Sequence, residues 1–278
     1  MTDPVELPDP DRRVEVGGVS LACDVRGQGG TPLVLVHGFT GGRIDFADVI
    51  DELADARQVV AHDHRGHADS TNTGEADGYT IQVLADDLAG LVDELGLDRF
   101  DLLGHSMGGL VVMRYAVDHP ERVRSLVLMD TLAGPADLPL EWIDHVVGLG
   151  RDQGMGAVAD LLSSFPQMFA SVPEERRPVV QARTAHKLAS MDVEALAALG
   201  AELCAFAPVH ERLADLGVPI TVIVGEHDLP LRGAAEALAT AVGLDGPVVI
   251  PDAAHSPQDE HPDAWLAAVR AHLAMADA

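Results

Sequence analysis

The chain has 278 residues, 47% of them hydrophobic, which is enough to bury a full core in a single domain. Its 45 acidic and 18 basic residues give a formal net charge of −27, so no basic face is expected to bind nucleic acid. No run of about 18 apolar residues predicts a membrane span, residues 1–12 show no secretion signal and two cysteines give no disulfide framework, so we expect a cytoplasmic protein.

Short apolar runs bounded by turn residues alternate with longer segments of helical period along the chain. This alternation is typical of an α/β fold with a mostly parallel sheet, here of about eight strands, covered by helices on both faces. An opening hairpin is predicted at 14–25, with its turn at Gly17-Gly18. Further strands are predicted at 33–36, 59–61, 100–103, 123–129, 220–224 and 248–250, and helices at 44–54, 81–95, 110–117, 234–242 and 263–274.

One long segment interrupts this rhythm. Residues 134–207 contain helical patterns but no strand-like run. Such a stretch would be unusual as a single crossover, so it is interpreted as a helical cap inserted into a core formed by residues 1–133 and 208–278. The alternative is that these helices belong to the outer layer of the sheet.

The sequence Gly104-His105-Ser106-Met107-Gly108 lies between a predicted strand and a predicted helix. A strand, a sharp turn and a helix form the context of a nucleophile elbow, in which the strained serine exposes its hydroxyl above the sheet. Side chains two residues to either side would collide there, and Gly104 and Gly108 remove that collision. Ser106 is therefore the predicted nucleophile.

A serine hydroxyl needs a base to take its proton, and the base needs an acid to orient it. His255 is the predicted base, because it follows the last predicted strand and precedes the last helix. Asp228, in the loop after the strand at 220–224, is the favoured acid. Asp130, which ends the strand at 123–129 and would alternatively cap the turn into the insertion, is its main rival, and Glu226 is a lesser one.

The strand at 33–36 runs into His37-Gly38-Phe39-Thr40-Gly41-Gly42, whose glycines allow a tight turn towards the predicted elbow. The backbone amides of Phe39 and Met107 are the predicted oxyanion donors, each stabilising the transition state by about 3 kcal/mol. A plain glycine turn is the alternative.

Together these motifs resemble the α/β-hydrolase family, specifically its capped esterase and lactonase-like branch. The resemblance implies that residues 63–70 form the family's Asp-x-Arg-Gly loop, in which Asp63 and Arg65 brace neighbouring loops. Two positions depart from the family pattern, because Ala68 and Ala254 stand where glycine is usual. If these sites need positive φ, alanine adds strain of about 1 kcal/mol. A serine at position 106 argues against the branches that attack with a carboxylate.

Other functions are compatible with parts of the sequence. His62, His64 and His67 with Asp63 form a cluster that could mark a metal-dependent hydrolase, although the spacing is not that of a closed zinc site and Arg65 would repel a cation. A non-hydrolytic receptor-like member is a second rival. Carbon–carbon bond hydrolysis, acyl transfer and cofactor-free perhydrolysis would use the same three residues.

The expected function is hydrolysis of a small or medium carboxylic ester or lactone through an acyl-enzyme on Ser106. No cofactor or metal is expected, and the partner is a small-molecule substrate rather than nucleic acid or membrane. Trp142, Phe169 and Leu229 are candidates for the pocket wall.

Overall fold

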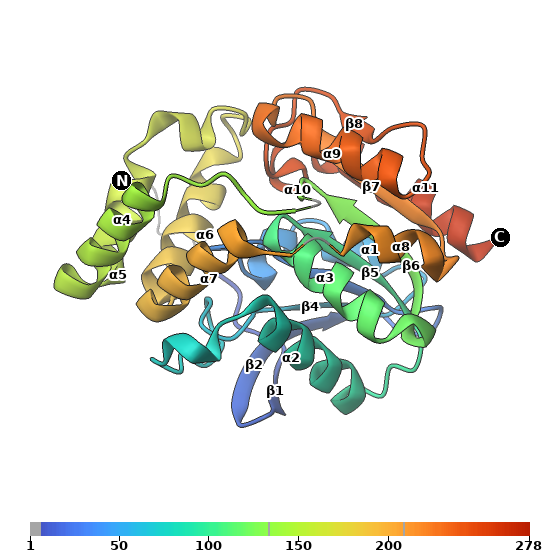
Figure 1. Ribbon diagram of the computed structural model, residues 1–278, viewed down its shortest axis with the longest axis horizontal. Coiled ribbons are helices and arrows are strands. Elements are labelled where there is room, and N and C mark those ends of the chain that lie inside the picture. Colours follow the sequence, from blue (N-terminus) through green and yellow to red (C-terminus); the bar gives the residue numbers. More distant parts are fainter. Residues whose placement is uncertain (1–6, 133, 208) are drawn as a thin grey trace.

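The computed structural model describes residues 7–132, 134–207 and 209–278 and is built around an eight-stranded sheet (Figure 1). The strand order is β1-β2-β4-β3-β5-β6-β7-β8, with β1 and β2 antiparallel to their neighbours and the other strands parallel. The predicted hairpin and the mostly parallel sheet are therefore confirmed. The strands are β1 (Arg12–Val16), β2 (Val19–Arg26), β3 (Leu33–Val36), β4 (Val59–His62), β5 (Phe100–His105), β6 (Val123–Met129), β7 (Ile220–Gly225) and β8 (Val248–Ile250).

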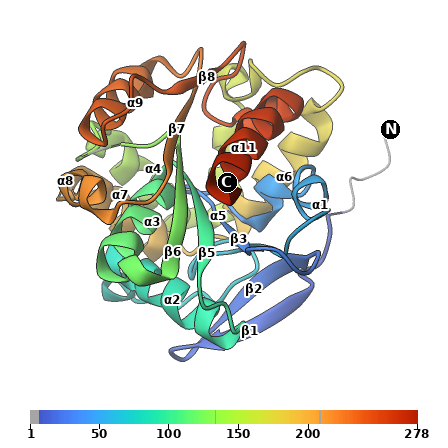
Figure 2. The same cartoon turned by 90° about the vertical axis from the view of Figure 1, so that its right-hand side faces the viewer.

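Helices cover both faces of the sheet (Figure 2). One face packs against α2 (Ile81–Glu94), α3 (Met107–Asp118) and α9 (Leu229–Ala241), and the other against α1 (Ile50–Leu53) and α11 (Pro262–Asp277). Successive side chains of a strand point to opposite faces, so Val34 and Val36 join the first cluster while Leu33 and Leu35 join the second. Strands buried on both sides explain the uninterrupted apolar runs of the sequence.

Two predicted helices have different boundaries in the structure. The segment predicted as one helix at 44–54 is a 3₁₀ turn at Arg43–Phe46 followed by α1, because the amides of Ala47 and Val49 bond to carbonyls three residues back. Helix α9 begins at Leu229, five residues before the predicted start at 234. A proline in the first turn is compatible with a helix, since its missing N–H has no partner there in any case.

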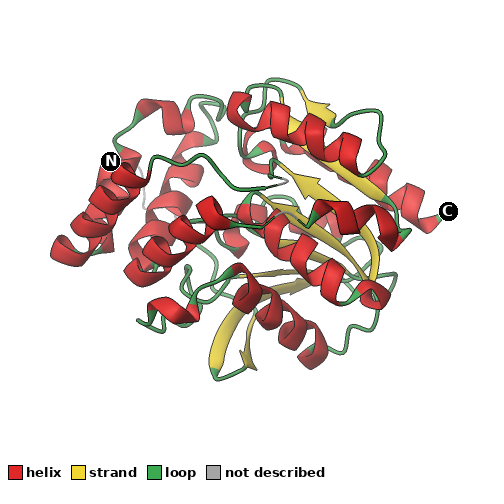
Figure 3. Cartoon of the chain, viewed as in Figure 1, coloured by secondary structure: helices red, strands yellow, loops and turns green. Residues whose placement is uncertain are grey.

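The segment between β6 and β7 is helical, and most of it lies on one side of the molecule (Figure 3), while its last helix, at His210–Leu213, packs against α3. It contains α4 (Leu140–Gln153), α5 (Met155–Ser163), α6 (Arg177–Ser190), α7 (Val193–Ala205) and α8 (His210–Leu213), and its described residues include no strand. Val146, Met155 and Leu199 belong to the same buried cluster as α2 and α3, so these helices extend that core. Across the described ranges, no helix has the length and apolarity needed to cross a bilayer.

Candidate active site

Ser106 occupies the turn between β5 and α3. Its backbone has φ 52° and ψ −119°, a conformation that non-glycine residues rarely adopt and that costs about 1–3 kcal/mol. The turn is held from the neighbouring strand, because the Ser106 amide donates to the carbonyl of Met129 at 2.9 Å and the Thr131 hydroxyl donates to the Ser106 carbonyl at 2.6 Å. Short bonds on both sides of the residue maintain the strained turn.

The glycines around Ser106 are required by close packing. A Cβ on Gly104 would lie 2.4 Å from the carbonyl oxygen of Gly108, and a Cβ on Gly108 would lie 2.3 Å from that of Val36. These distances are far shorter than van der Waals contact. Positions 104 and 108 therefore require glycine because helix α3 packs closely against β3 and β5.

Three side chains meet at the carboxyl edge of the sheet, by which we mean the ends of β3, β5, β6, β7 and β8. The Nε2 atom of His255 lies 3.1 Å from Oγ of Ser106, and its Nδ1 lies 2.7 Å from Oδ2 of Asp228. Asp228 follows β7 and is 6% exposed, whereas His255 follows β8 and is half-exposed. This is the geometry of a serine, a general base and an orienting acid.

The loop that carries His255 is fixed by its neighbours. The ring of His105, the residue before Ser106, donates from Nε2 to the carbonyl of His255 at 2.6 Å. On the other side, the Glu260 carboxylate accepts the amides of Ala254 and Ser256. Burial lowers the pKa of His105 to about 3, so this ring is neutral and serves as a structural donor.

The two candidate acids occupy different positions behind His255. Oδ1 of Asp130 accepts the amide of Gly225 at 2.8 Å, so this carboxyl group joins β6 to β7. Among the described residues it accepts no amide of the turn into the helical segment, which is the alternative role considered from the sequence. One oxygen each of Asp130 and Asp228 and a ring nitrogen of His255 lie within 4.8 Å of one another. Glu226 is exposed and accepts the amide of Asp252, away from His255.

The pKa values of Asp130 and Asp228 are shifted in opposite directions. Asp130 has no solvent exposure, and desolvation raises its pKa well above the usual range. Burial also raises the pKa of Asp228, but the hydrogen bond and charge of His255 outweigh it and lower this pKa overall. Asp130 is therefore the protonated member of the pair, and Asp228 is the carboxylate that faces His255.

The loop after β3 lies against Ser106. A Cβ on Gly38 would be 2.9 Å from the Cβ of Ser106, so glycine is needed for this approach. Thr40 has φ 60°, which turns the chain sharply after Phe39. Met107 begins α3, and among the described residues neither its amide nor that of Phe39 has a hydrogen-bond acceptor. The N–H groups of both amides are therefore available to a ligand beside Ser106.

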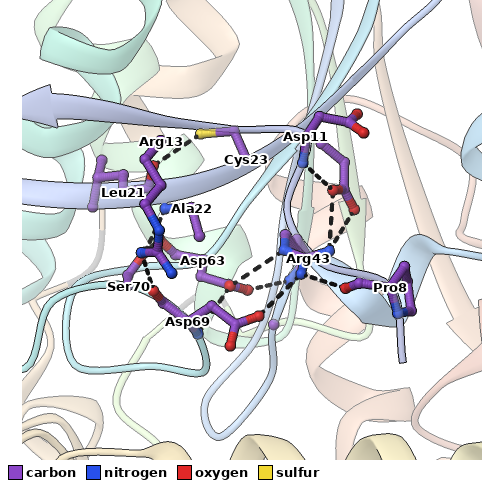
Figure 4. Close-up of polar contacts among 12 residues, drawn as sticks. Pro8, Asp11, Arg13, Leu21, Ala22, Cys23, Arg43, Asp63, Asp69 and Ser70 are labelled. Atoms are coloured by element: carbon purple, nitrogen blue, oxygen red, sulfur yellow. Dashed lines mark hydrogen bonds and ion pairs between the residues drawn. The ribbon is translucent and has the colours of Figure 1, made fainter. Parts of the chain in front are cut away.

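A buried arginine holds this loop from behind (Figure 4). The amide of Arg43 donates to Oδ1 of Asp63 at 2.6 Å. Its guanidinium contacts both oxygens of Asp24 at 2.9 and 3.0 Å, Asp69 at 3.0 Å and the carbonyl of Pro8 at 2.8 Å. The side chain of Arg43 is completely buried, and neither Arg43 nor Asp24 carries a motif that would have revealed this role from the sequence.

The loop at 63–70 forms the other half of this support. Asp63 accepts the amides of Arg43 and Asp69, and Arg65 forms a bidentate pair with Asp87 of α2 at 2.5 and 2.6 Å. Ala68 has φ 42°, so one of the two expected sites of alanine strain is present. Ala254 does not have positive φ; two residues earlier, Asp252 makes the left-handed turn with φ 59°.

The histidine cluster below the loop is neutral and buried. Burial lowers the pKa of His62 and of His67 to about 4, and it lowers that of His64 well below the usual range. Sets of three potential ligand atoms within 4.8 Å occur in the described part of the chain at Asp130, Asp228 and His255 and at the exposed Glu226, His227 and Asp252, but not within this cluster. The geometry does not favour the metal-hydrolase alternative.

Two cavities adjoin Ser106 and His255. A cavity of about 380 Å³ extends under α6 and includes Phe169 in its wall, and one of about 830 Å³ opens towards Leu110 and Leu203. Trp142 and Leu229 line neither cavity, which corrects their expected place in the pocket wall. Trp142 packs beside His145 and Phe165, while Leu229 begins α9 with its side chain 77% exposed.

Comparison with known proteins places this geometry in a family. The family model for the alpha/beta hydrolase fold matches residues 31–262. The solved structure of a thermophilic esterase from Thermogutta terrifontis is 32% identical, with a TM-score of 0.80 over 95% of this chain and 99% of that one. An enol-lactonase from Burkholderia xenovorans LB400 is 28% identical, with a TM-score of 0.79 over 95% and 100%.

A curated relative extends this similarity along the chain. A 2-(acetamidomethylene)succinate hydrolase from Mesorhizobium japonicum is 29% identical over 93% of both chains. Matches to a fluoroacetate dehalogenase and a 2-hydroxymuconate semialdehyde hydrolase cover only 45% and 52% of those proteins. The chain belongs to the α/β-hydrolase family, which contains enzymes acting on several kinds of bond.

Proposed function

We propose that this protein is a serine hydrolase that cleaves a small or medium carboxylic ester or lactone through an acyl-enzyme on Ser106. The contact that supports this most directly is the chain of hydrogen bonds from Ser106 to His255 at 3.1 Å and from His255 to Asp228 at 2.7 Å. The similarity to an esterase and an enol-lactonase supports the choice of substrate class.

In the proposed reaction, His255 takes the hydroxyl proton as Oγ of Ser106 attacks the substrate carbonyl. The resulting oxyanion is held by the amides of Phe39 and Met107, and collapse of the intermediate releases the alcohol with the proton from His255. Water activated by the same imidazole then attacks the acyl-enzyme and releases the acid. Asp228 orients the ring and stabilises the imidazolium formed at each step.

A substrate panel with the variant Ser106→Ala tests this proposal. We expect the wild type to hydrolyse p-nitrophenyl acetate and simple lactones, and Ser106→Ala to lose about 10⁴-fold or more in kcat. Circular dichroism and thermal unfolding of the variant should show an intact fold. Undiminished hydrolysis by a folded Ser106→Ala variant would exclude the proposed nucleophile.

The same panel separates related reactions. Adding an amide and a β-diketone, with alcohol acceptors and peroxide in parallel assays, compares hydrolysis of esters with carbon–carbon cleavage, acyl transfer and perhydrolysis. The proposal predicts the highest kcat/KM for an ester or lactone with water as the acceptor. A preference for the β-diketone would retain the three residues and reject the substrate class.

A further inference from the structure

The two cavities beside Ser106 differ in the chemistry of their walls. The larger one is lined mainly by aliphatic side chains from the loop after β6 and from helices α3, α7 and α9: Leu110, Leu132, Leu138, Leu203 and Leu231. The smaller one also has apolar side chains, including Phe169 and Val180, but in addition it contains Lys187 and Thr184 of α6 together with Asp45, Asp259 and Glu260. A substrate spanning both would carry an apolar part and a polar part on opposite sides of the reacting carbonyl.

Lys187 is the only lysine in the chain, and it is buried in the wall of the smaller cavity. A lysine ammonium has three hydrogens to donate and cannot accept a hydrogen bond. Among the described residues, its one hydrogen-bond acceptor is Oδ1 of Asp45. Lys187 therefore has N–H groups left for a ligand in the cavity.

The acidic side chains of the same cavity already have donors. Oδ2 of Asp45 accepts the amide of Gly42 at 3.0 Å, in addition to the contact of its other oxygen with Lys187. The two oxygens of Glu260 accept the amides of Ala254 and Ser256. These carboxylates are satisfied by the protein, so they do not call for a donor from the ligand.

Asp259 is the third acidic residue of this cavity. Arg183 is paired with Asp48 at 2.6 and 2.8 Å, and it approaches Asp259 only at 3.5 Å. Burial, followed by the charge of Asp45, raises the pKa of Asp259 to about 7, so a large fraction of it is protonated at neutral pH. A protonated Asp259 adds a second donor to the wall that Lys187 lines.

We propose that the smaller cavity binds a carboxylate group of the substrate through Lys187, with Thr184 beside it, so that the natural substrate is an ester or lactone bearing a free carboxylate. The inference rests on the proposed function of Ser106, because that residue fixes where the reacting carbonyl lies. A carboxylate accepts hydrogen bonds from an ammonium group, and Lys187 has N–H groups beyond the one bonded to Asp45.

Binding to a variant that cannot react separates this inference from the chemistry. In the Ser106→Ala background, calorimetry with monomethyl succinate, glutarate and adipate should show binding of at least one, with the methyl ester of the matched monocarboxylic acid at least tenfold weaker. Adding Lys187→Met should weaken the preferred monoester at least tenfold. Equal affinity for charged and uncharged esters, or affinity unaffected by Lys187→Met, would overturn the inference.

Two further variants control for charge and folding. Lys187→Met leaves Asp45 without its partner, so the double variant Lys187→Met/Asp45→Asn should show the same loss of carboxylate affinity. Arg151→Met removes a cation of α4 that pairs with Glu194, and neither residue lines either cavity, so it should leave the ratio of the two affinities unchanged. A similar loss in Arg151→Met would indicate a general effect of net charge and reject the site.

Turnover provides the second readout. In a chain with Ser106 intact, kcat/KM for the preferred monoester should exceed that for the uncharged ester at least tenfold, and Lys187→Met should remove most of that ratio. Hydrolysis of uncharged esters without a preference for the monoester would contradict the carboxylate site alone. Binding of the monoester that depends on Lys187, with no ester hydrolysed, would contradict the proposed function alone.

Discussion

The carboxyl edge of the sheet and the helical segment at 134–207 hold their functional side chains in different ways. At the sheet edge, Asp130 and His37 have no solvent exposure, and Ser106 is held in a strained turn by bonds from β6 and Thr131. In the helical segment, Met168 in the wall of the smaller cavity is 40% exposed. If the proposals hold, the catalytic side chains are positioned by buried, multiply bonded neighbours, whereas recognition of the substrate depends on a few side chains such as Lys187.

The largest expected effect separates the two carboxyl groups at the sheet edge. Asp228→Asn should lower kcat by about 10³–10⁴-fold, because the amide cannot hold His255 in the tautomer that accepts the Ser106 proton. Asp130→Asn should lower kcat less than about tenfold, because Asp130 is already protonated and the amide keeps an acceptor for Gly225. Steady-state kinetics on an ester measures both.

Glu226→Gln supplies the matched control for these substitutions. It changes another carboxylate after β7, but this one is exposed and faces Asp252, so kcat should stay within about twofold. If Asp130→Asn fell as far as Asp228→Asn while remaining folded, the proposed division of roles between the two acids would be wrong.

The next effect concerns the buried ion pairs behind the loop after β3. Arg43→Met leaves the carboxylates of Asp24, Asp63 and Asp69 without their shared cation, and breaking a buried ion pair in this way costs about 3–5 kcal/mol. Urea denaturation should report this loss. Arg26→Met is the control, since Arg26 is more exposed and pairs with Asp11 and Asp51 at a cost below about 1 kcal/mol. Equal losses in both variants would contradict the bracing role.

A smaller effect appears in the pH dependence of stability. His62 has a pKa lowered to about 4 by burial, while in the unfolded chain it titrates near 6.5, so the unfolded state binds more protons between these values. Stability is therefore lost as pH falls below about 6.5. His62→Phe should reduce the slope of unfolding free energy against pH by about 1.4 kcal/mol per unit in that range.

The control for this measurement is His227→Gln, which changes a half-exposed histidine at the sheet edge. Its unfolding free energy would be measured over the same pH range, so that the change in His62→Phe is compared with that of a histidine substitution outside the core. An unchanged slope in His62→Phe would mean that burial does not hold His62 neutral in the folded protein.

The sequence predicts the sheet edge better than the helical segment, for physical reasons. Ser106, Asp228 and His255 each follow an apolar strand, and parallel strands bring their carboxyl ends to one edge. Close backbone contacts around Ser106 require glycine at positions 104 and 108, so a Gly-x-Ser-x-Gly pattern in the sequence indicates them. Leu229 was misplaced because adjacency to Asp228 in the sequence does not fix the direction of a side chain, and α9 turns it into solvent.

Other functional groups leave no local signal. Lys187 is one cation in an amphipathic helix, and its position in a cavity depends on how α6 packs over the loop after β3. Arg43 meets Asp24 across 19 positions of sequence and Asp69 across 26. Such contacts follow from tertiary packing, so spacing and periodicity alone do not predict them.

The identity of the nucleophile is tested most directly by covalent labelling. The protein would be treated with a fluorophosphonate, digested and mapped by mass spectrometry, with residual ester hydrolysis measured on the same sample. We predict one label, on Ser106, in proportion to the activity lost. Full labelling elsewhere, or unlabelled Ser106 in fully inhibited protein, would contradict the account.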